Sequence, residues 1–295
     1  MKRPVIIDTD LTVDDAVALA VVAQAENIDI KAVTIVGKNA AETAMVAETF
    51  CKKYNIYCQT GTGAVKPIFK DEFSTDDIYG EHAVYGSFLP CCGNVCDKYA
   101  WDVICAEAEK AKGELEILTL GPLTNIAVTL LRYPHIKSLI KRIFVVAGAG
   151  YTGNVAPYSE YNAYCDPDAL QIVLDSGIPV VLCPLEATEN RKLSTEEIMH
   201  TEFKSETVKK LFDICTNKAN ICAENNINLY SLAATAAFVT DSFETKDYYV
   251  ICETRSGENQ GWTIIDRLGK YKKEPNIKVV TETDKVTFVK TIFNL

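Results

Sequence analysis

Four carboxylates crowd the turn that follows the first apolar run of the chain. They belong to Asp8, Asp10, Asp14 and Asp15. Carboxylates this close repel one another and raise each other's pKa unless a cation compensates. Backbone amides at a helix N-terminus could hold one or two of them, but four exceed what a helix end needs. The spacing therefore favours a bound hard cation with oxygen ligands from Asp10 and Asp15 over a turn with a simple helix cap.

A second polar segment, residues 153–167, supplies groups that could hold a polyol. It carries Asn154, Glu160 and Asn162, whose side chains offer donors and acceptors for several hydroxyls. The alternative for these three is a hydrogen-bonded surface loop. For Asp166 we expect only a structural role, as the N-cap of a helix that begins at Pro167.

Stretches typical of strands and helices alternate along the chain and would position both segments. Predicted strands cover residues 28–36, 56–61, 115–120, 142–147 and 179–183, and predicted helices cover 40–54, 101–112 and 232–240. The strands are apolar throughout, which indicates an α/β fold with a mostly parallel sheet covered by helices on both faces. Ligands bind at the carboxyl ends of such strands, where both polar segments fall. With no repeat or linker, residues 1–295 are expected to form one domain.

Composition excludes some classes of protein. The 295 residues are 48% hydrophobic and carry a formal net charge of −10, which argues against nucleic-acid binding as the main role. No opening stretch resembles a signal peptide, and no apolar run reaches about 18 residues, so we expect a cytoplasmic protein without a membrane span. Residues 62–97 lack clear periodicity, which is typical of a functional loop or lid.

Eleven cysteines raise the question of a metal or redox site. Cys91, Cys92 and Cys96 form the densest group, and His82 lies nearby. The spacing of a zinc site is absent there, since no C-x-x-C pair occurs. Reduced thiols are the preferred interpretation.

Taken together, these segments resemble the nucleoside hydrolases, the inosine–uridine-preferring N-ribohydrolases. The resemblance rests on D-x-D-x-x-x-D-D at residues 8–15, V-G-K-N at 36–39, G-P-L-T-N at 121–125, the segment 153–162 and I-D-R-L-G at 265–269. It implies a Rossmann-like α/β domain that binds Ca²⁺ at the strand ends and assembles as a homodimer or homotetramer. The ligand would be a nucleoside or another ribose-containing molecule.

The resemblance also implies a role for individual residues. Asp10, Asp15 and the backbone carbonyl of Leu120 would hold the calcium, and Asp14 would be the general base for a calcium-bound water. The product would be ribose and a free base, formed through a transition state that resembles an oxocarbenium ion. The residues expected to hold the ribose hydroxyls are Asp14, Asn39, Asn154, Glu160 and Asn162.

The chain departs from the family pattern at a late His-Asp pair, whose Asp completes the calcium shell and whose His lies near the base. Alignment places Leu229 at the His and Tyr230 at the Asp. A neutral phenol is a poor calcium ligand, and leucine transfers no proton. Tyr230 is nevertheless kept as a candidate substrate contact.

Two readings follow from this departure. In the first, the chain is a hydrolase in which water or Ser231 fills the metal shell. His82 or a lid tyrosine, Tyr79 or Tyr85, would then activate the base. In the second, it is a nucleoside- or ribose-binding pseudoenzyme. A phosphate-binding nucleotide enzyme is a weaker third reading, because the glycine turns at 61–63 and 148–150 lack the spacing of a P-loop.

Overall fold

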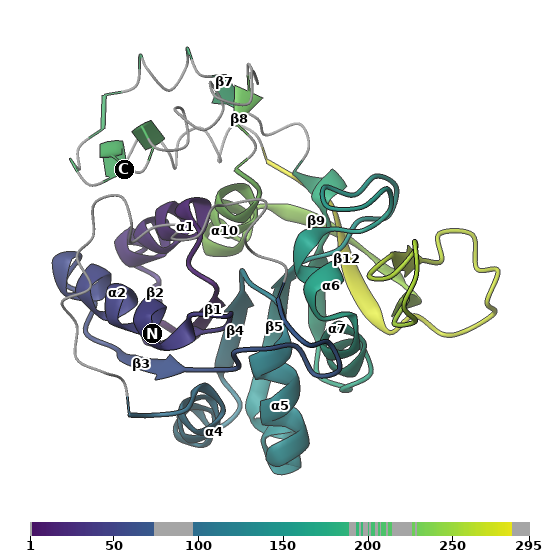
Figure 1. Ribbon diagram of the computed structural model, residues 1–295, viewed down its shortest axis with the longest axis horizontal. Coiled ribbons are helices and arrows are strands. Elements are labelled where there is room, and N and C mark those ends of the chain that lie inside the picture. The colour runs from purple at the N-terminus through teal and green to yellow at the C-terminus, as the bar shows by residue number, and fades with distance from the viewer. Residues whose placement is uncertain are drawn as a thin grey trace.

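The centre of the molecule is an eight-stranded sheet (Figure 1). The computed structural model describes residues 2–73, 97–188 and 229–284, together with isolated positions between 193 and 227. All neighbouring strands of the sheet run parallel except β9, which is antiparallel to β12. In spatial order the strands are β3 (Gln59–Thr62), β2 (Ile28–Ile35), β1 (Arg3–Thr9), β4 (Leu115–Thr119), β5 (Ile140–Val146), β6 (Val180–Cys183), β12 (Ile277–Thr283) and β9 (Phe243–Tyr248). The predicted mostly parallel sheet is confirmed.

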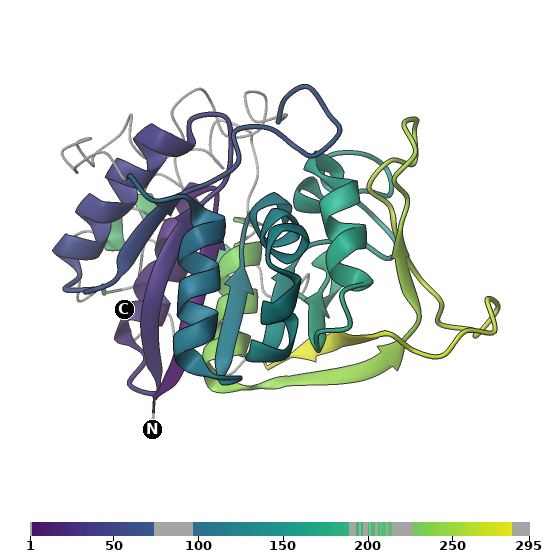
Figure 2. The ribbon, with the colours of Figure 1, turned by 90° about the horizontal axis from the view of Figure 1, so that it is seen from below.

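Helices cover both faces of this sheet, as the two views show (Figures 1 and 2). One apolar cluster lies under α1 (Val13–Gln24), α2 (Ala40–Lys53) and α10 (Tyr230–Thr240). A second lies under α4 (Ala100–Ala111), α5 (Thr124–Arg132) and α7 (Pro167–Leu174). Strands buried on both faces explain why their sequences read as continuous apolar runs rather than alternating ones.

Shorter elements connect these layers. They are α6 (Tyr161–Cys165), the 3₁₀ helices η1 (Pro134–Leu139) and η2 (Leu185–Ala187), and two small antiparallel pairs. The pairs join β10 (Val250–Cys252) to β11 (Thr263–Ile265), and β7 (Leu193–Ser194) to β8 (Asn226–Ile227). Among the described helices, none is long and apolar enough to cross a bilayer.

Some element boundaries differ from those predicted. Strand β1 continues to Thr9, so Asp8 is a strand residue and not part of the turn. The third strand begins at Gln59, three residues later than expected, because α2 is followed by a turn up to Asn55 and an irregular stretch. The edge strand β9 was not foreseen, because its side chains are mostly half-buried or exposed and its sequence lacks an apolar run. The sequence also predicts helices over residues 195–223 and 284–293, and most of both stretches lies outside the described residues.

The strand order reverses between β1 and β4. From β1 the chain moves outward through β2 to β3, and from β4 it moves the other way through β5 and β6. In open parallel sheets the crevice at such a reversal, outside the carboxyl ends of the strands, is where ligands bind. The acidic turn follows β1 and the G-P-L-T-N turn follows β4, so the fold brings both to this crevice.

Candidate active site

The turns after β1 and β4 pack directly against each other. A Cβ atom added at Gly121 would lie 2.8 Å from the backbone nitrogen of Asp10, so only glycine fits there. On the other side, a Cβ atom at Gly37 would lie 3.9 Å from the Cβ of Asp10. Asp10 therefore sits between the turns that follow β2 and β4.

Two of the four carboxylates are fully buried and only partly satisfied by hydrogen bonds. Asp8 Oδ1 accepts from Thr34 Oγ1 at 2.5 Å and from Asn125 Nδ2 at 2.8 Å, and Asp15 Oδ2 accepts from Thr9 Oγ1 at 2.7 Å. The second oxygens, Asp8 Oδ2 and Asp15 Oδ1, are buried and accept no hydrogen bond from the described residues. Unpaired buried carboxylate oxygens are costly, so each marks a place where a ligand would be bound.

The electrostatics of this cluster call for a cation. Burial raises the pKa of Asp8 to about 7. Burial and the charge of Asp15 raise the pKa of Asp10 well above its ordinary value, and burial and the charge of Asp14 raise that of Asp15. The ion pairs of the described residues include none with these four carboxylates. The donor set of crowded carboxylate oxygens therefore fits a hard divalent cation.

Asp14 differs from its neighbours in exposure. It stands in the first turn of α1 and is only half-buried, and its Oδ1 accepts a hydrogen bond from Thr12 Oγ1 at 2.6 Å. Thr12 itself is the N-cap of α1, with its hydroxyl facing the Asp15 amide at 3.5 Å. A half-buried carboxylate held at a helix start is placed to reach a ligand in the crevice.

Glu160 and Asn162 are buried and tie together the ends of β4 and β5. Glu160 caps α6, and its oxygens accept from the amides of Gly148 at 2.8 Å, Asn162 at 2.9 Å and Ala163 at 3.1 Å. Burial raises its pKa to about 7 although these hydrogen bonds oppose the shift. Asn162 Nδ2 donates to the carbonyls of Leu120 at 2.7 Å and Val146 at 2.9 Å. The Leu120 carbonyl keeps one lone pair for a further partner.

The remaining predicted polyol contacts lie further out. Asn39 is exposed and stands at the N-cap of α2. Asn154 is also exposed, and its Oδ1 accepts from the Tyr161 amide at 2.9 Å. Asp166 caps α7 as predicted, with its Oδ1 accepting from the Ala169 amide at 3.0 Å.

Tyr230 occupies the start of α10, beside the buried residue Leu229. Its hydroxyl donates to the backbone carbonyl of Cys183 at 2.5 Å. Burial and the charge of Glu160 raise its pKa well above the ordinary value, so the phenol is a neutral donor. Its contact with substrate stays a prediction. His82, Tyr79, Tyr85 and the group Cys91, Cys92 and Cys96 lie outside the described residues.

Two features near the crevice were not identified from the sequence. Asn125 was noted only as part of a motif, yet it holds Asp8 and also accepts from the Ala64 amide at 2.8 Å, which joins the ends of β1 and β3. Glu186 was not singled out at all. It accepts from the Gly150 amide and pairs with Arg267 at 2.7 Å. The family-like motif I-D-R-L-G at residues 265–269, which contains Arg267, was the one sequence signal that could have led to this pair.

Comparison with known proteins gives the same result over nearly the whole chain. The profile of the inosine-uridine preferring nucleoside hydrolases matches residues 5–290. The chain is 28% identical over 288 residues to the non-specific ribonucleoside hydrolase RihC of Escherichia coli (strain SMS-3-5 / SECEC), covering 96% of this chain and 95% of the relative. It is 29% identical over 290 residues to the pyrimidine-specific ribonucleoside hydrolase RihB of Escherichia coli O1:K1 / APEC, with coverage of 94% and 92%.

Solved structures agree in fold. A plant nucleoside hydrolase superimposes with a TM-score of 0.87 at 22% identity, covering 99% of this chain and 98% of that one. An inosine-uridine preferring nucleoside hydrolase from Bacillus anthracis superimposes with a TM-score of 0.81 at 24% identity, with the same coverage. At these identities the structures show a shared fold and no more.

Proposed function

The chain belongs to the inosine-uridine preferring nucleoside hydrolase family, and from that premise we propose that it hydrolyses the N-glycosidic bond of ribonucleosides to ribose and free base. The observation that carries the proposal is the buried carboxylate cluster at the reversal of strand order, where Asp8 Oδ2 and Asp15 Oδ1 have no partner among the described residues.

A calcium ion is proposed as the cofactor. Asp10, Asp15 and the Leu120 carbonyl would hold it, since they are oxygen donors at adjoining strand ends and no cationic side chain of the described residues pairs with the acids. When bound, it would orient the attacking water and lower its pKa. Its charge would also relieve the mutual repulsion that now raises the pKa of Asp10 and Asp15.

Asp14 is proposed as the general base. Its half-buried carboxylate would take a proton from the water as the oxygen attacks the anomeric carbon of ribose. The electron pair of the glycosidic bond leaves with the nucleobase, and the sugar develops positive charge. The neighbouring carboxylates, ionised beside a cation, would stabilise that charge.

Ribose would be held by Asp14 together with asparagine and glutamate side chains at the strand ends. Asn39 and Asn154 are exposed, so they suit the outer hydroxyl contacts. Glu160 uses three of its acceptor positions on backbone amides, which leaves capacity for one hydroxyl. Asn162 donates a hydrogen bond to the Leu120 carbonyl and so fixes its position.

We also propose that the chain assembles as a homodimer or homotetramer.

Release of reducing sugar from a panel of purine and pyrimidine ribonucleosides tests the proposal. The assay is run with calcium, with chelator, and with the Asp14→Ala variant. Asp168→Ala is the matched control, because Asp168 holds the corresponding place in the first turn of α7 and is not among the residues proposed to hold the cation, the water or ribose. We expect calcium-dependent release that Asp14→Ala lowers by about 10²–10⁴-fold and Asp168→Ala leaves intact.

The same preparation separates hydrolysis from binding. The hydrolase proposal would be refuted if no ribonucleoside released reducing sugar while ribose or a nucleoside protected the chain against thermal unfolding. That outcome would leave a binding protein on this fold, the reading that the replacement at Leu229 and Tyr230 favours. Release that is unchanged in Asp14→Ala would instead remove Asp14 as the base.

A further inference from the structure

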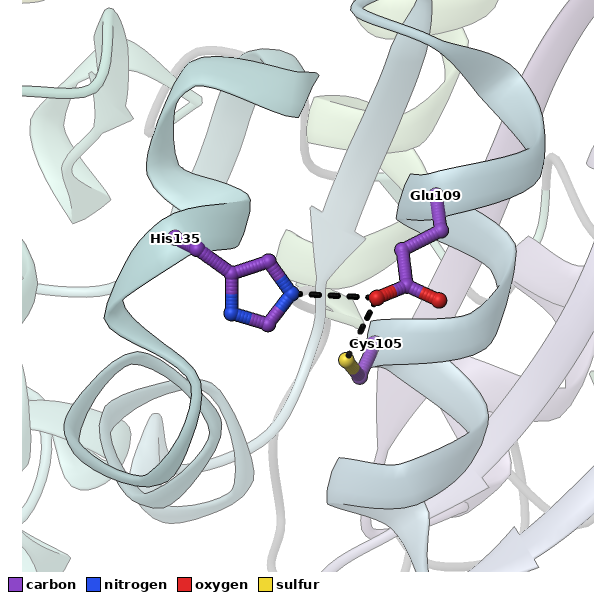
Figure 3. Close-up of side chains that lie close together, drawn as sticks. All are labelled: Cys105, Glu109 and His135. Atoms are coloured by element: carbon purple, nitrogen blue, oxygen red, sulfur yellow. Dashed lines mark hydrogen bonds and ion pairs between the residues drawn. The ribbon is translucent and has the colours of Figure 1, made fainter.

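Three side chains of different ligand types meet on the surface formed by α4 and η1 (Figure 3). Cys105 and Glu109 are four residues apart on α4 and share one helix face. His135 is near the start of η1 and points toward them. Glu109 Oε1 lies 3.0 Å from His135 Nε2 and 3.9 Å from Cys105 Sγ. All three ligand atoms lie within 4.8 Å of one another.

The segment that carries His135 is fixed against α4 by its neighbours. Tyr133 donates its hydroxyl hydrogen to Asp102 Oδ1 on α4 at 2.6 Å. Its ring also meets the ring of His135 edge to face, with centroids 6.2 Å apart. Arg132 Nε donates to the same tyrosine oxygen at 2.9 Å. The imidazole is therefore positioned by the fold rather than by its bond to Glu109 alone.

The spacing of the three atoms suits a tetrahedral metal. With ordinary zinc–ligand bond lengths, tetrahedral geometry separates N from O by about 3.4 Å and S from O by about 3.6 Å. Two of the observed separations, 3.0 Å and 3.9 Å, lie within about 0.4 Å of those values, and the third, between Cys105 and His135, is within 4.8 Å. We propose that Cys105, Glu109 and His135 bind a divalent transition-metal cation of the zinc class. A mixture of thiolate, imidazole and carboxylate selects zinc over calcium or magnesium.

Access and charge agree with this assignment. The side chains of Glu109 and His135 are 55% and 56% exposed, while Cys105 is 7% exposed at the base of the site. A cation can enter from solvent, and water would complete the fourth position. Three protein ligands are enough for zinc when the fourth position is taken by water.

This site is separate from the crevice. Glu109 lies in the last turn of α4, which leads into the amino end of β4, Cys105 lies one turn earlier at the middle of the helix, and His135 precedes β5. All three ligands therefore stand toward the amino ends of the strands, whereas the carboxylate cluster stands at the carboxyl ends. Bound metal would link α4 to η1 and stabilise the folded chain without touching the hydrolytic groups.

Titration of the metal-free chain with Co²⁺ as a probe, then displacement by Zn²⁺, tests the proposal. We expect the charge-transfer absorption of a cobalt–thiolate bond, which a calcium site of carboxylates cannot produce. His135→Ala should weaken the affinity at least tenfold, and Cys105→Ser should abolish the absorption. Cys58→Ser is the matched control, since it removes another thiol, which lies beside Cys51 and is not one of the three proposed ligands.

Thermal unfolding supplies a second measurement. Zn²⁺ should raise the Tm of the wild-type chain and of Cys58→Ser, and this increase should be lost in His135→Ala, whose exposed side chain can be removed without opening the core. Nucleoside hydrolysis should be the same in all of them. Equal stoichiometry, absorption and Tm shift in wild type, His135→Ala and Cys105→Ser would overturn the proposal.

Discussion

The hydroxyl of Tyr230 donates a hydrogen bond to the backbone carbonyl of Cys183 at 2.5 Å. This bond ties the first residue of α10 to the end of β6, beside the carboxylate cluster. The family resemblance places a calcium-binding aspartate at this position. Here the side chain is a neutral, buried donor committed to the backbone, so its role in the described structure is to hold two elements together.

Removing the hydroxyl of Tyr230 should therefore affect stability and leave metal affinity unchanged. The Tyr230→Phe variant leaves the buried Cys183 carbonyl without that donor, which costs about 1–3 kcal/mol. Denaturant unfolding of the metal-free chain measures the loss, and calorimetric titration with calcium measures the affinity.

The Tyr230→Asp variant sharpens this comparison. It offers a carboxylate where the family pattern has one, so we expect calcium to bind at least tenfold more tightly than to wild type. If Tyr230→Phe itself weakened calcium binding tenfold, the phenol would be a ligand and the structural role assigned to it would be wrong.

The central sheet was predictable because strands buried on both faces are apolar along their whole length. The same rule fails for β9, where only one flank is paired with a described strand and the side chains are half-buried or exposed. It also fails for Asp8, which looks like a turn residue in the sequence. In the structure, Thr34 and Asn125 satisfy one of its oxygens within the sheet. That arrangement depends on residues 26 and 117 positions away, which no local pattern reveals.

Candidate ligands were easier to find than their roles. Type and spacing identified Asn39, Asn154 and Asn162 as polar groups at strand ends, but they gave no indication of burial. Only the packing shows that Asn162 braces two backbone carbonyls while Asn39 stands exposed. The group of Cys105, Glu109 and His135 was missed for a related reason. The histidine lies 26 positions from Glu109 and meets it only through the contact of α4 with η1.

The two asparagines should respond differently to truncation. Asn39→Ala should raise the KM for ribonucleosides about tenfold, since its exposed side chain is proposed to contact ribose. Asn162→Ala should lower stability by about 2–4 kcal/mol, because the carbonyls of Leu120 and Val146 both lose a buried donor. Steady-state kinetics and thermal unfolding of both variants check this. An unchanged KM in Asn39→Ala, or an unchanged Tm in Asn162→Ala, would contradict the assignment.

Stability of the metal-free chain should fall as the pH rises through the range set by Glu160. Burial raises the pKa of this acid from its ordinary 4.5 to about 7, so the folded chain binds more protons than the unfolded chain between these values. Stability falls with rising pH wherever the folded state binds more protons, and it becomes level above the folded pKa. The difference corresponds to about 3 kcal/mol. Unfolding by denaturant at pH 4.5, 6 and 8 measures the slope, and Glu160→Gln, which cannot ionise, should reduce it.

Calcium should stabilise the folded chain, and this stabilisation should become stronger as the pH rises. Asp10 and Asp15 also have raised pKa values, so below neutrality a cation must displace protons from them before it can bind. At pH 8 Asp15, whose pKa is raised to about 6, has lost its proton, and the cation meets an ionised carboxylate. The increase in Tm on adding calcium should therefore be larger at pH 8 than at pH 5, and it should vanish in Asp10→Asn at both. An increase that is the same at both pH values would mean that calcium binds away from these buried acids, and the proposed cofactor site would have to be abandoned.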